Sequence, residues 1–381
     1  MVPGPARVRG STLVDDSAFL DDGRLPVRPT CSSWQRRFVL RLWVRRRSGR
    51  VTAAETGTSV PKDPQPESKE PQTAISGRTP LPTEEDGRDG VLLRPRGPLN
   101  LALTLETGQA FRWRQEDEWY RGVVGRNIWK VRQMSRALEI RSGPEPASLV
   151  AGEARSYFRL DDDLGAIYRE LGRDERVARA IRKYRGLRLV RQDPWECMVS
   201  FIISAYSNVK RITKHIEDLS LAYGDPITFE GVTRHTFPSP ARLAELGEQD
   251  FRDMGLGYRS KSLARLARDL LDRGLDLHSL RSAPYTEAKE ALLTIHGIGD
   301  KVADCILLFS LDKLEAFPVD VWVRRAVTEW YFPDQKVTDR TVRLWAAEHF
   351  GGHAGYAQQY LFHQRRLQQQ AERGRMPPLK V

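Results

Sequence analysis

The chain has 381 residues, 40% of them hydrophobic, and 61 Lys plus Arg against 50 Asp plus Glu give a formal net charge of +11. This length allows two or three domains, and the positive excess favours a polyanionic partner, either nucleic acid or an acidic membrane surface. No apolar run approaches the roughly 18 residues of a membrane span. Cys31, Cys197 and Cys305 share no short spacing. This excludes a zinc site, a four-cysteine iron–sulfur site and a disulfide framework, and it is typical of a reducing, intracellular compartment.

Residues 1–95 are predicted to be a disordered, proline-rich and basic tail. Between residues 51 and 90 there is no aromatic residue and proline recurs six times, so the segment has too little apolar surface to offset its ordering entropy. Residues 33–50 are basic with interleaved aromatic residues, which fits a helix that binds a membrane surface or nucleic acid. Four aspartates before residue 23 argue against a transit peptide. The open alternative is that the translation start has been assigned too far upstream, so that this tail is not part of the native protein.

The rest of the chain is predicted to be an α+β protein with two domains. Over residues 96–165, short segments such as "LNLALTLE", "EWYRGVVGR" and "NIWKVRQM" alternate with a period near two, which predicts an antiparallel sheet with one buried face. Over residues 166–372 the apolar spacing changes to three and four, with aspartates before and glycines after several segments. This pattern predicts an all-α domain.

The segment "EALLTIHGIGDKVADCILLF" predicts two helices joined by a tight turn. Gly297 and Gly299 permit positive φ and close approach by another backbone, and the free N–H groups at the start of the second helix suit a phosphate. Most Gly-x-Gly motifs are only turns. Lys301 starts the second helix among apolar residues, and both the helix dipole and burial lower the pKa of such an amine. Taken alone, Lys301 is better explained as a surface lysine at the start of a helix.

Several separated segments together resemble the helix-hairpin-helix DNA glycosylases, and in particular the 8-oxoguanine DNA glycosylase/AP lyases. The hairpin followed by "PVDV" carries the resemblance, along with "GQAFRWR", "LRLVRQDPWECMVSFIIS", "MGLGYRSK" and "AGYAQQYLF", all in the expected order. The match covers about residues 99–370. It implies a sheet domain followed by a helical domain that holds the hairpin.

The resemblance implies two catalytic residues. Lys301 would attack C1′ of the damaged nucleotide and hold the sugar as a Schiff base, after which elimination nicks the strand. Asp320 would stabilise the cationic sugar and help to activate the amine. Asp320 also fits an ordinary helix N-cap.

The resemblance also implies a pocket for a flipped base and a set of DNA contacts. Gly108 would accept the N7–H of oxidised guanine, Gln358 would read the polar edge, and Phe362 would stack on the ring, while Cys305 shares a helix face with Lys301. Core packing is the simpler reading of Cys305 or Phe362 taken alone. The implied DNA contacts are Asn208, Arg211, Tyr258, Arg259, Gly297 and Gly299. Among them, Tyr258 would wedge into the duplex, and Arg211 and Arg259 would read the orphaned base.

Two positions depart from the family pattern. Tyr206 stands where many members have an asparagine that helps to recognise the opposite cytosine, and this puts opposite-base selectivity in doubt. Trp322 stands where some members have a histidine that contacts phosphate.

We therefore expect a monomeric, DNA-associated enzyme of the cytoplasm, nucleoid or nucleus that acts on double-stranded DNA containing oxidised guanine, with no membrane partner. We expect no cofactor, no catalytic metal and no iron–sulfur cluster, and a structural cation is compatible with the turn at residues 295–298. Two alternatives remain: the same scaffold with another base specificity, and a non-catalytic helix-hairpin-helix DNA-binding protein. The second predicts no need for Lys301 and Asp320.

Overall fold

The computed structural model describes residues 84–86, 90–372 and 374. All of these described residues belong to one compact unit. The predictions for residues 1–83, including the basic segment at 33–50, lie outside the described residues. Among the residues that the structure describes, no helix is long and apolar enough to cross a membrane.

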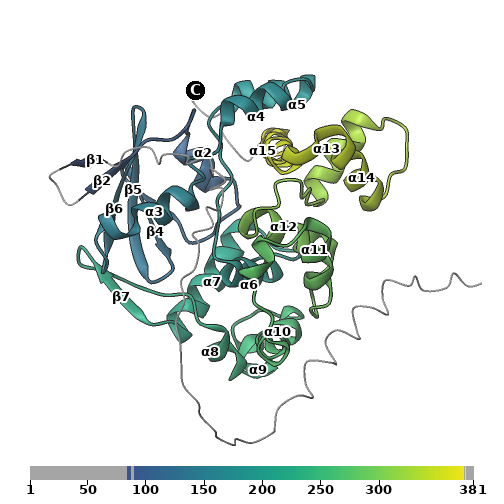
Figure 1. Ribbon diagram of the computed structural model, residues 1–381. Coiled ribbons are helices and arrows are strands. Elements are labelled where there is room, and N and C mark those ends of the chain that lie inside the picture. Colours follow the sequence, from purple (N-terminus) through teal and green to yellow (C-terminus); the bar gives the residue numbers. More distant parts are fainter. Residues whose placement is uncertain (1–83, 87–89, 373, 375–381) are drawn as a thin grey trace, which may run out of the picture. The chain divides into compact units, whose positions relative to one another are not determined.

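A six-stranded antiparallel sheet forms the first part of the fold, with the strand order β1-β2-β6-β5-β4-β3 (Figure 1). Its strands are β1 (Glu84–Asp86), β2 (Gly90–Leu93), β3 (Arg114–Glu116), β4 (Trp119–Val124), β5 (Asn127–Met134) and β6 (Ala137–Gly143). The predicted antiparallel sheet is thus confirmed. Strand β2 lies on the tail side of the predicted boundary at residue 96 and pairs with β6, Val91 opposite Ile140.

The expectation of a single buried face is wrong for β4, which is buried at all six positions. Helix α3 (Ala147–Tyr157) packs against β2 and β6. A hairpin of β7 (Pro226–Phe229) and β8 (Val232–His235) packs against β5 and β6. Glu230 at its tip pairs with Lys130 of β5 at 2.7 Å. This hairpin corrects the prediction of an all-α second domain. Its two strands have only four residues each, too few to stand out from the helical pattern around them.

The predicted strand at "LNLALTLE" is also wrong, because these residues form helix α2 (Leu101–Glu106). The side chain of Asn100 caps the helix by accepting the Leu103 N–H at 3.0 Å. Leu101, Thr104 and Leu105 are buried, a spacing of three and four that places them on one helical face. Alternating leucines in so short a segment fit both periods, and the cap decides between them.

The second part of the fold is helical, as predicted. Its α-helices are α4 (Leu164–Leu171), α5 (Glu175–Lys183), α6 (Pro194–Ile203), α7 (Val209–Tyr223), α8 (Pro240–Ala244), α9 (Glu248–Asp253), α10 (Arg259–Arg273), α11 (Tyr285–Leu293), α12 (Asp300–Ser310), α13 (Val321–Tyr331), α14 (Asp339–Phe350) and α15 (Ala354–Glu372). Asp163, Asp174 and Asp193 cap α4, α5 and α6 with their side chains, which explains the aspartates before these segments.

Helices α11 and α12 form the predicted hairpin. Ile295 and Ile298 anchor the turn in the core. Gly297 has a φ of +87°, and a Cβ there would lie 2.5 Å from Ser262 Oγ, so the position requires glycine. A Cβ on Gly299 would meet nothing within 4 Å. The second glycine therefore leaves the start of α12 open to an approaching group.

A buried network joins the sheet to the helical part. Gln109 is fully buried, donates to Arg188 O at 2.8 Å and accepts the Val190 N–H at 2.9 Å. The guanidinium of Arg188, also fully buried, donates to the carbonyls of Arg96, Pro98, Arg159 and Asp162. Burial lowers the pKa of Arg188 from its usual value. The network holds the segment after α2 against the extended chain before α6.

Replacing Arg188 with Met should lower the free energy of unfolding by about 3 kcal/mol, because each buried carbonyl left unpaired costs ~1–3 kcal/mol. Urea denaturation followed by circular dichroism measures this. Arg182→Met, at an exposed position of α5, is the control and should change stability by less than about 0.5 kcal/mol. Equal effects of the two substitutions would contradict the structural role of Arg188.

Candidate active site

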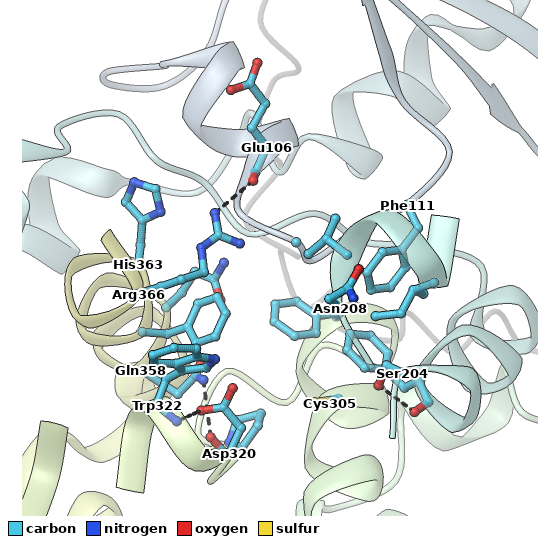
Figure 2. A pocket seen from close by; sticks show the side chains of 18 of the residues that line it. Glu106, Phe111, Ser204, Asn208, Cys305, Asp320, Trp322, Gln358, His363 and Arg366 are labelled. Atoms are coloured by element: carbon cyan, nitrogen blue, oxygen red, sulfur yellow. Dashed lines mark hydrogen bonds between the residues drawn. The ribbon is translucent and has the colours of Figure 1, made fainter. Parts of the chain in front are cut away.

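A cavity of about 810 Å³ opens between two groups of helices. Figure 2 shows Gln358, His363 and Arg366 of α15 on one side, with Trp322 and Asp320 below them, and Phe111, Asn208, Ser204 and Cys305 on the other. Glu106 of α2 lies above. The cavity brings together all the residues predicted for catalysis and for the base pocket: Gly108, Lys301, Cys305, Asp320, Gln358 and Phe362.

Lys301 enters the cavity from the first turn of α12. Its Nζ lies 3.5 Å from Ser204 Oγ and 5.2 Å from the ring centre of Phe201, both on the α6 side. Cys305 follows one turn later and is 3% exposed. Burial raises the pKa of the Cys305 thiol to about 11, an effect that the nearby Lys301 ammonium opposes. The thiol is therefore protonated at neutral pH.

Asp320 caps helix α13, as its position after "PV" predicted. Its Oδ1 accepts the N–H groups of Trp322 at 2.9 Å and Val323 at 2.8 Å. Burial raises the pKa of this carboxyl above its usual value, while the bond from Val323 and the Lys301 ammonium act in the opposite direction. The cap thus fixes a buried carboxylate close enough to Lys301 for the two charges to interact.

Helix α15 supplies one wall at four-residue intervals. The Gln358 amide donates to Pro318 O at 3.2 Å, and its Oε1 is buried without a partner. Phe362 follows one turn later, and the guanidinium of Arg366 lies 5.5 Å from its ring centre. The wall therefore combines an unpaired acceptor, an aromatic face and a cation.

Arg366 is a residue that our sequence reasoning missed. Its Nη1 donates to Thr107 O at 3.3 Å and its Nη2 to Glu106 O at 3.2 Å. A Cβ on Gly108, whose φ is +82°, would lie 3.3 Å from Arg366 Nη1. The available signal was its place four residues after Phe362 on the same helical face.

The predicted DNA contacts lie beyond these walls, apart from Asn208. Asn208 lines the cavity and caps α7 by accepting the Arg211 N–H at 3.0 Å. Arg211 donates from Nη2 to Gly255 O at 3.3 Å. Tyr258 is 59% exposed, whereas Arg259 is buried and bonded to backbone carbonyls. Gly297 and Gly299 lie in the turn before α12.

Trp322 also lines the cavity, next to Asp320 (Figure 2). The guanidinium of Arg325 lies 5.9 Å from its ring centre. The indole therefore contributes an aromatic surface to the cavity wall. Among the described residues, no cluster of three or more His, Cys, Asp or Glu is arranged to hold a metal ion, and the expected absence of a cofactor stays a prediction.

Comparison with known proteins agrees with this geometry. Residues 91–198 match the family "8-oxoguanine DNA glycosylase, N-terminal domain", and residues 199–348 match the "HhH-GPD superfamily base excision DNA repair protein". The probable N-glycosylase/DNA lyase of Methanothermobacter thermautotrophicus is 33% identical over 71% of this chain and 95% of its own length. N-glycosylase/DNA lyase OGG1 of Arabidopsis thaliana is 35% identical over 69% of this chain and 76% of its own length.

A solved structure leads to the same class. The 8-oxoguanine glycosylase/lyase of Clostridium acetobutylicum, in complex with dsDNA containing cytosine opposite 8-oxoG, is 32% identical with a TM-score of 0.72, covering 76% of this chain and 99% of that one. A sheet joined to a helical domain with a lysine and a carboxylate in one cavity is the architecture of a base excision protein. The chain belongs to the HhH-GPD superfamily and, within it, to the 8-oxoguanine glycosylase/lyase family.

Proposed function

We propose that this chain is a bifunctional base-excision-repair enzyme. It removes 8-oxoguanine from duplex DNA and nicks the resulting abasic site by β-elimination. The observation that carries the proposal is that Lys301 and Asp320 line the same cavity as Gly108, Gln358 and Phe362, although these residues come from distant parts of the sequence. Sequence relatives named N-glycosylase/DNA lyase support it.

Lys301 is the nucleophile of this proposal. Its neutral amine attacks C1′ while the bond from C1′ to the damaged base breaks, and the departing base takes up a proton. The C1′–O4′ bond then breaks, O4′ takes up a proton, and the opened sugar is held as a Schiff base on the Lys301 nitrogen. Loss of a proton from C2′ expels the 3′ phosphate and nicks the strand. Helix α12 directs the amine into the cavity, and Ser204 and Phe201 hold it there.

Asp320 supplies the negative charge. A carboxylate held rigidly by two backbone N–H groups stabilises positive charge on the sugar without reorganising. It also stabilises the positive charge that the Lys301 nitrogen acquires as it bonds to C1′. Because one oxygen serves the helix cap, the side chain has little freedom to turn away.

The base pocket uses the remaining cavity residues. The Gly108 carbonyl accepts the N7–H that distinguishes 8-oxoguanine from guanine, and the unpaired Oε1 of Gln358 accepts from the polar edge of the base. Phe362 stacks on one face and Cys305 lies toward the other. Arg366 holds the carbonyls on the N-terminal side of Gly108. It therefore positions the group that makes the discrimination.

The DNA backbone is held at the hairpin turn. Gly297 and Gly299 let phosphate approach the start of α12, and Asn208, Arg211 and Tyr258 contact the strands around the flipped nucleotide. The proposal takes the chain as a monomer acting in the compartment that contains the DNA, without a catalytic metal or iron–sulfur cluster and with room for a structural cation at residues 295–298. It keeps the order of a tail, a sheet domain and a catalytic domain at 166–372, but it counts β1 and β2 in the sheet domain and not in the tail.

Borohydride trapping on a duplex containing 8-oxoguanine tests the nucleophile. The full chain should give a covalent adduct, and Lys301→Gln should abolish it because no amine reaches C1′. Lys336→Gln, at an exposed position, is the matched control and should trap like the unaltered chain. No adduct with the unaltered chain, or an undiminished one with Lys301→Gln, would sink the mechanism.

Asp320→Asn should lower the single-turnover excision rate by about 10²- to 10³-fold, because a fixed electrostatic partner of the sugar is lost. Asn retains the oxygen that caps α13. Binding of a duplex with an uncleavable abasic analogue should change far less. Asp272→Asn, exposed on α10, should leave the rate unaltered, and an unchanged rate in Asp320→Asn would contradict the role of the carboxylate.

The same substitution should not destabilise the fold at neutral pH. The pKa of the Asp320 carboxyl is raised in the folded chain, so its charge weakens folding above that pKa and protonation relieves the effect. The melting temperature of Asp320→Asn at pH 7.5 should equal or exceed that of the unaltered chain. The difference should close as pH falls through the folded pKa, and a lower melting temperature at pH 7.5 would contradict this sign.

Arg366→Met tests the support of Gly108. Without the guanidinium the two carbonyls before Gly108 lose a donor, and excision of 8-oxoguanine should fall about tenfold, as expected for loss of roughly 1.4 kcal/mol. Nicking of a preformed abasic site requires no base recognition and should be unaffected. Arg365→Met, at the neighbouring position paired with Glu329, should leave the ratio of the two activities unchanged. Equal losses in both activities would show that Arg366 has only a structural role.

A further inference from the structure

The loop between α6 and α7 displays an unusual tyrosine. Tyr206 is 97% exposed, and its φ is +48°. The left-handed backbone conformation is sterically strained for an aromatic residue. Neither the exposed ring nor the strained backbone stabilises the free chain. The arrangement therefore points to a contact that the free chain lacks.

Arg259 holds the loop in this conformation. It is 6% exposed, and its Nε donates to Ala205 O at 2.9 Å while its Nη2 donates to Ala205 O and to Tyr206 O, the latter at 3.2 Å. Its Nη1 donates to Leu256 O at 3.4 Å. Most of its donors are thus bonded to the protein's own backbone. The guanidinium therefore shapes the loop in the free chain, and reading a base would require these bonds to break.

Tyr206 and Tyr258 together form an exposed aromatic pair. Their ring centres are 6.5 Å apart at an interplanar angle of 68°. The Tyr258 hydroxyl donates to Ala205 O at 3.1 Å, the same carbonyl that Arg259 binds. Both rings are therefore anchored to one short segment, which presents them as a unit.

This pair stands at the rim of the cavity. Ser204, Ser207 and Asn208, on either side of Tyr206, line the cavity, as does Lys210 at the start of α7. A duplex whose damaged nucleotide is turned into the cavity must place its gap, and the unpaired base of the other strand, against this rim. An aromatic face stacks on any nucleobase, because every base has a π-face.

We propose that Tyr206 is a second stacking residue, which packs on the unpaired base of the opposite strand while Tyr258 fills the gap. Arg259 is the positioning residue that holds both. The ligand is a nucleobase of the undamaged strand, recognised by stacking rather than by its hydrogen-bonding edge. The enzyme therefore discriminates weakly among the four opposite bases. The inference rests on the proposed function, since it assumes a flipped nucleotide.

Binding measurements test the inference without requiring catalysis. Fluorescence anisotropy gives the Kd for duplexes that carry a tetrahydrofuran abasic analogue opposite each of the four bases, or opposite a second abasic analogue. The unaltered chain should bind the four base-containing duplexes within about threefold of one another. Removing the opposite base should weaken binding about tenfold, as expected for loss of one stacked base.

Two substitutions assign the effect to the ring. Tyr206→Gly removes the ring and suits the positive φ, so the loop keeps its shape. It should weaken binding about tenfold to each base-containing duplex and should not weaken binding when the opposite base is absent. Tyr206→Phe keeps the ring and should bind like the unaltered chain. With 2-aminopurine opposite the analogue, stacking should quench fluorescence in the unaltered chain and in Tyr206→Phe but not in Tyr206→Gly.

The outcomes separate this inference from the proposed function. A preference of more than tenfold for cytosine over the other bases, or unchanged affinity and quenching in Tyr206→Gly, would overturn the stacking role while leaving the glycosylase assignment intact. If Tyr206→Gly also raises the Kd for the duplex that lacks the opposite base, the ring only stabilises the loop and does not stack on a base. Failure of the unaltered chain to bind any of the duplexes would overturn both proposals.

Discussion

The buried network around Gln109 and Arg188 is the interaction on which the cavity depends. Gln109 pairs with the backbone of the extended segment before α6, while Arg188 donates to carbonyls of the chain that follows β2 and of the chain that follows α3. Buried polar groups of this kind stabilise only when they are paired, so the network allows one arrangement of the two parts. That arrangement carries Gly108, the neighbour of Gln109, to the cavity wall formed by the helical part.

The rest of the cavity follows from helix termini. Lys301 lies in the first turn of α12 and Asp320 caps α13, so each reactive group is placed by backbone geometry rather than by a flexible loop. Arg366 then connects the wall of α15 to the carbonyls before Gly108. The chemistry of an amine and a carboxylate thus becomes available on a rigid frame, at the expense of burying charge.

The burial of Arg259 changes the role that the structure supports for this residue. Arg259 was expected to read the orphaned base, yet its donors bind the backbone of residues 205, 206 and 256. Its assignment to base reading stays a prediction that requires these bonds to break. The exposed ring of Tyr206, seen from the sequence only as a departure from the family pattern, becomes the better candidate for contacting that base.

The sequence by itself determined the antiparallel sheet, the hairpin of α11 and α12, the capping aspartates and the pairs Lys301/Cys305 and Gln358/Phe362, because these features depend on local spacing and local hydrogen bonds. It did not determine α2, where a short leucine pattern fits two periods, or the β7–β8 hairpin, whose strands have only four residues each and where β7 packs on the sheet. Only the tertiary structure decided that Gly108, Lys301, Asp320 and Arg366 share one cavity and that Arg259 is buried. Contacts between distant segments depend on packing and on the pairing of buried polar groups, which no local pattern encodes.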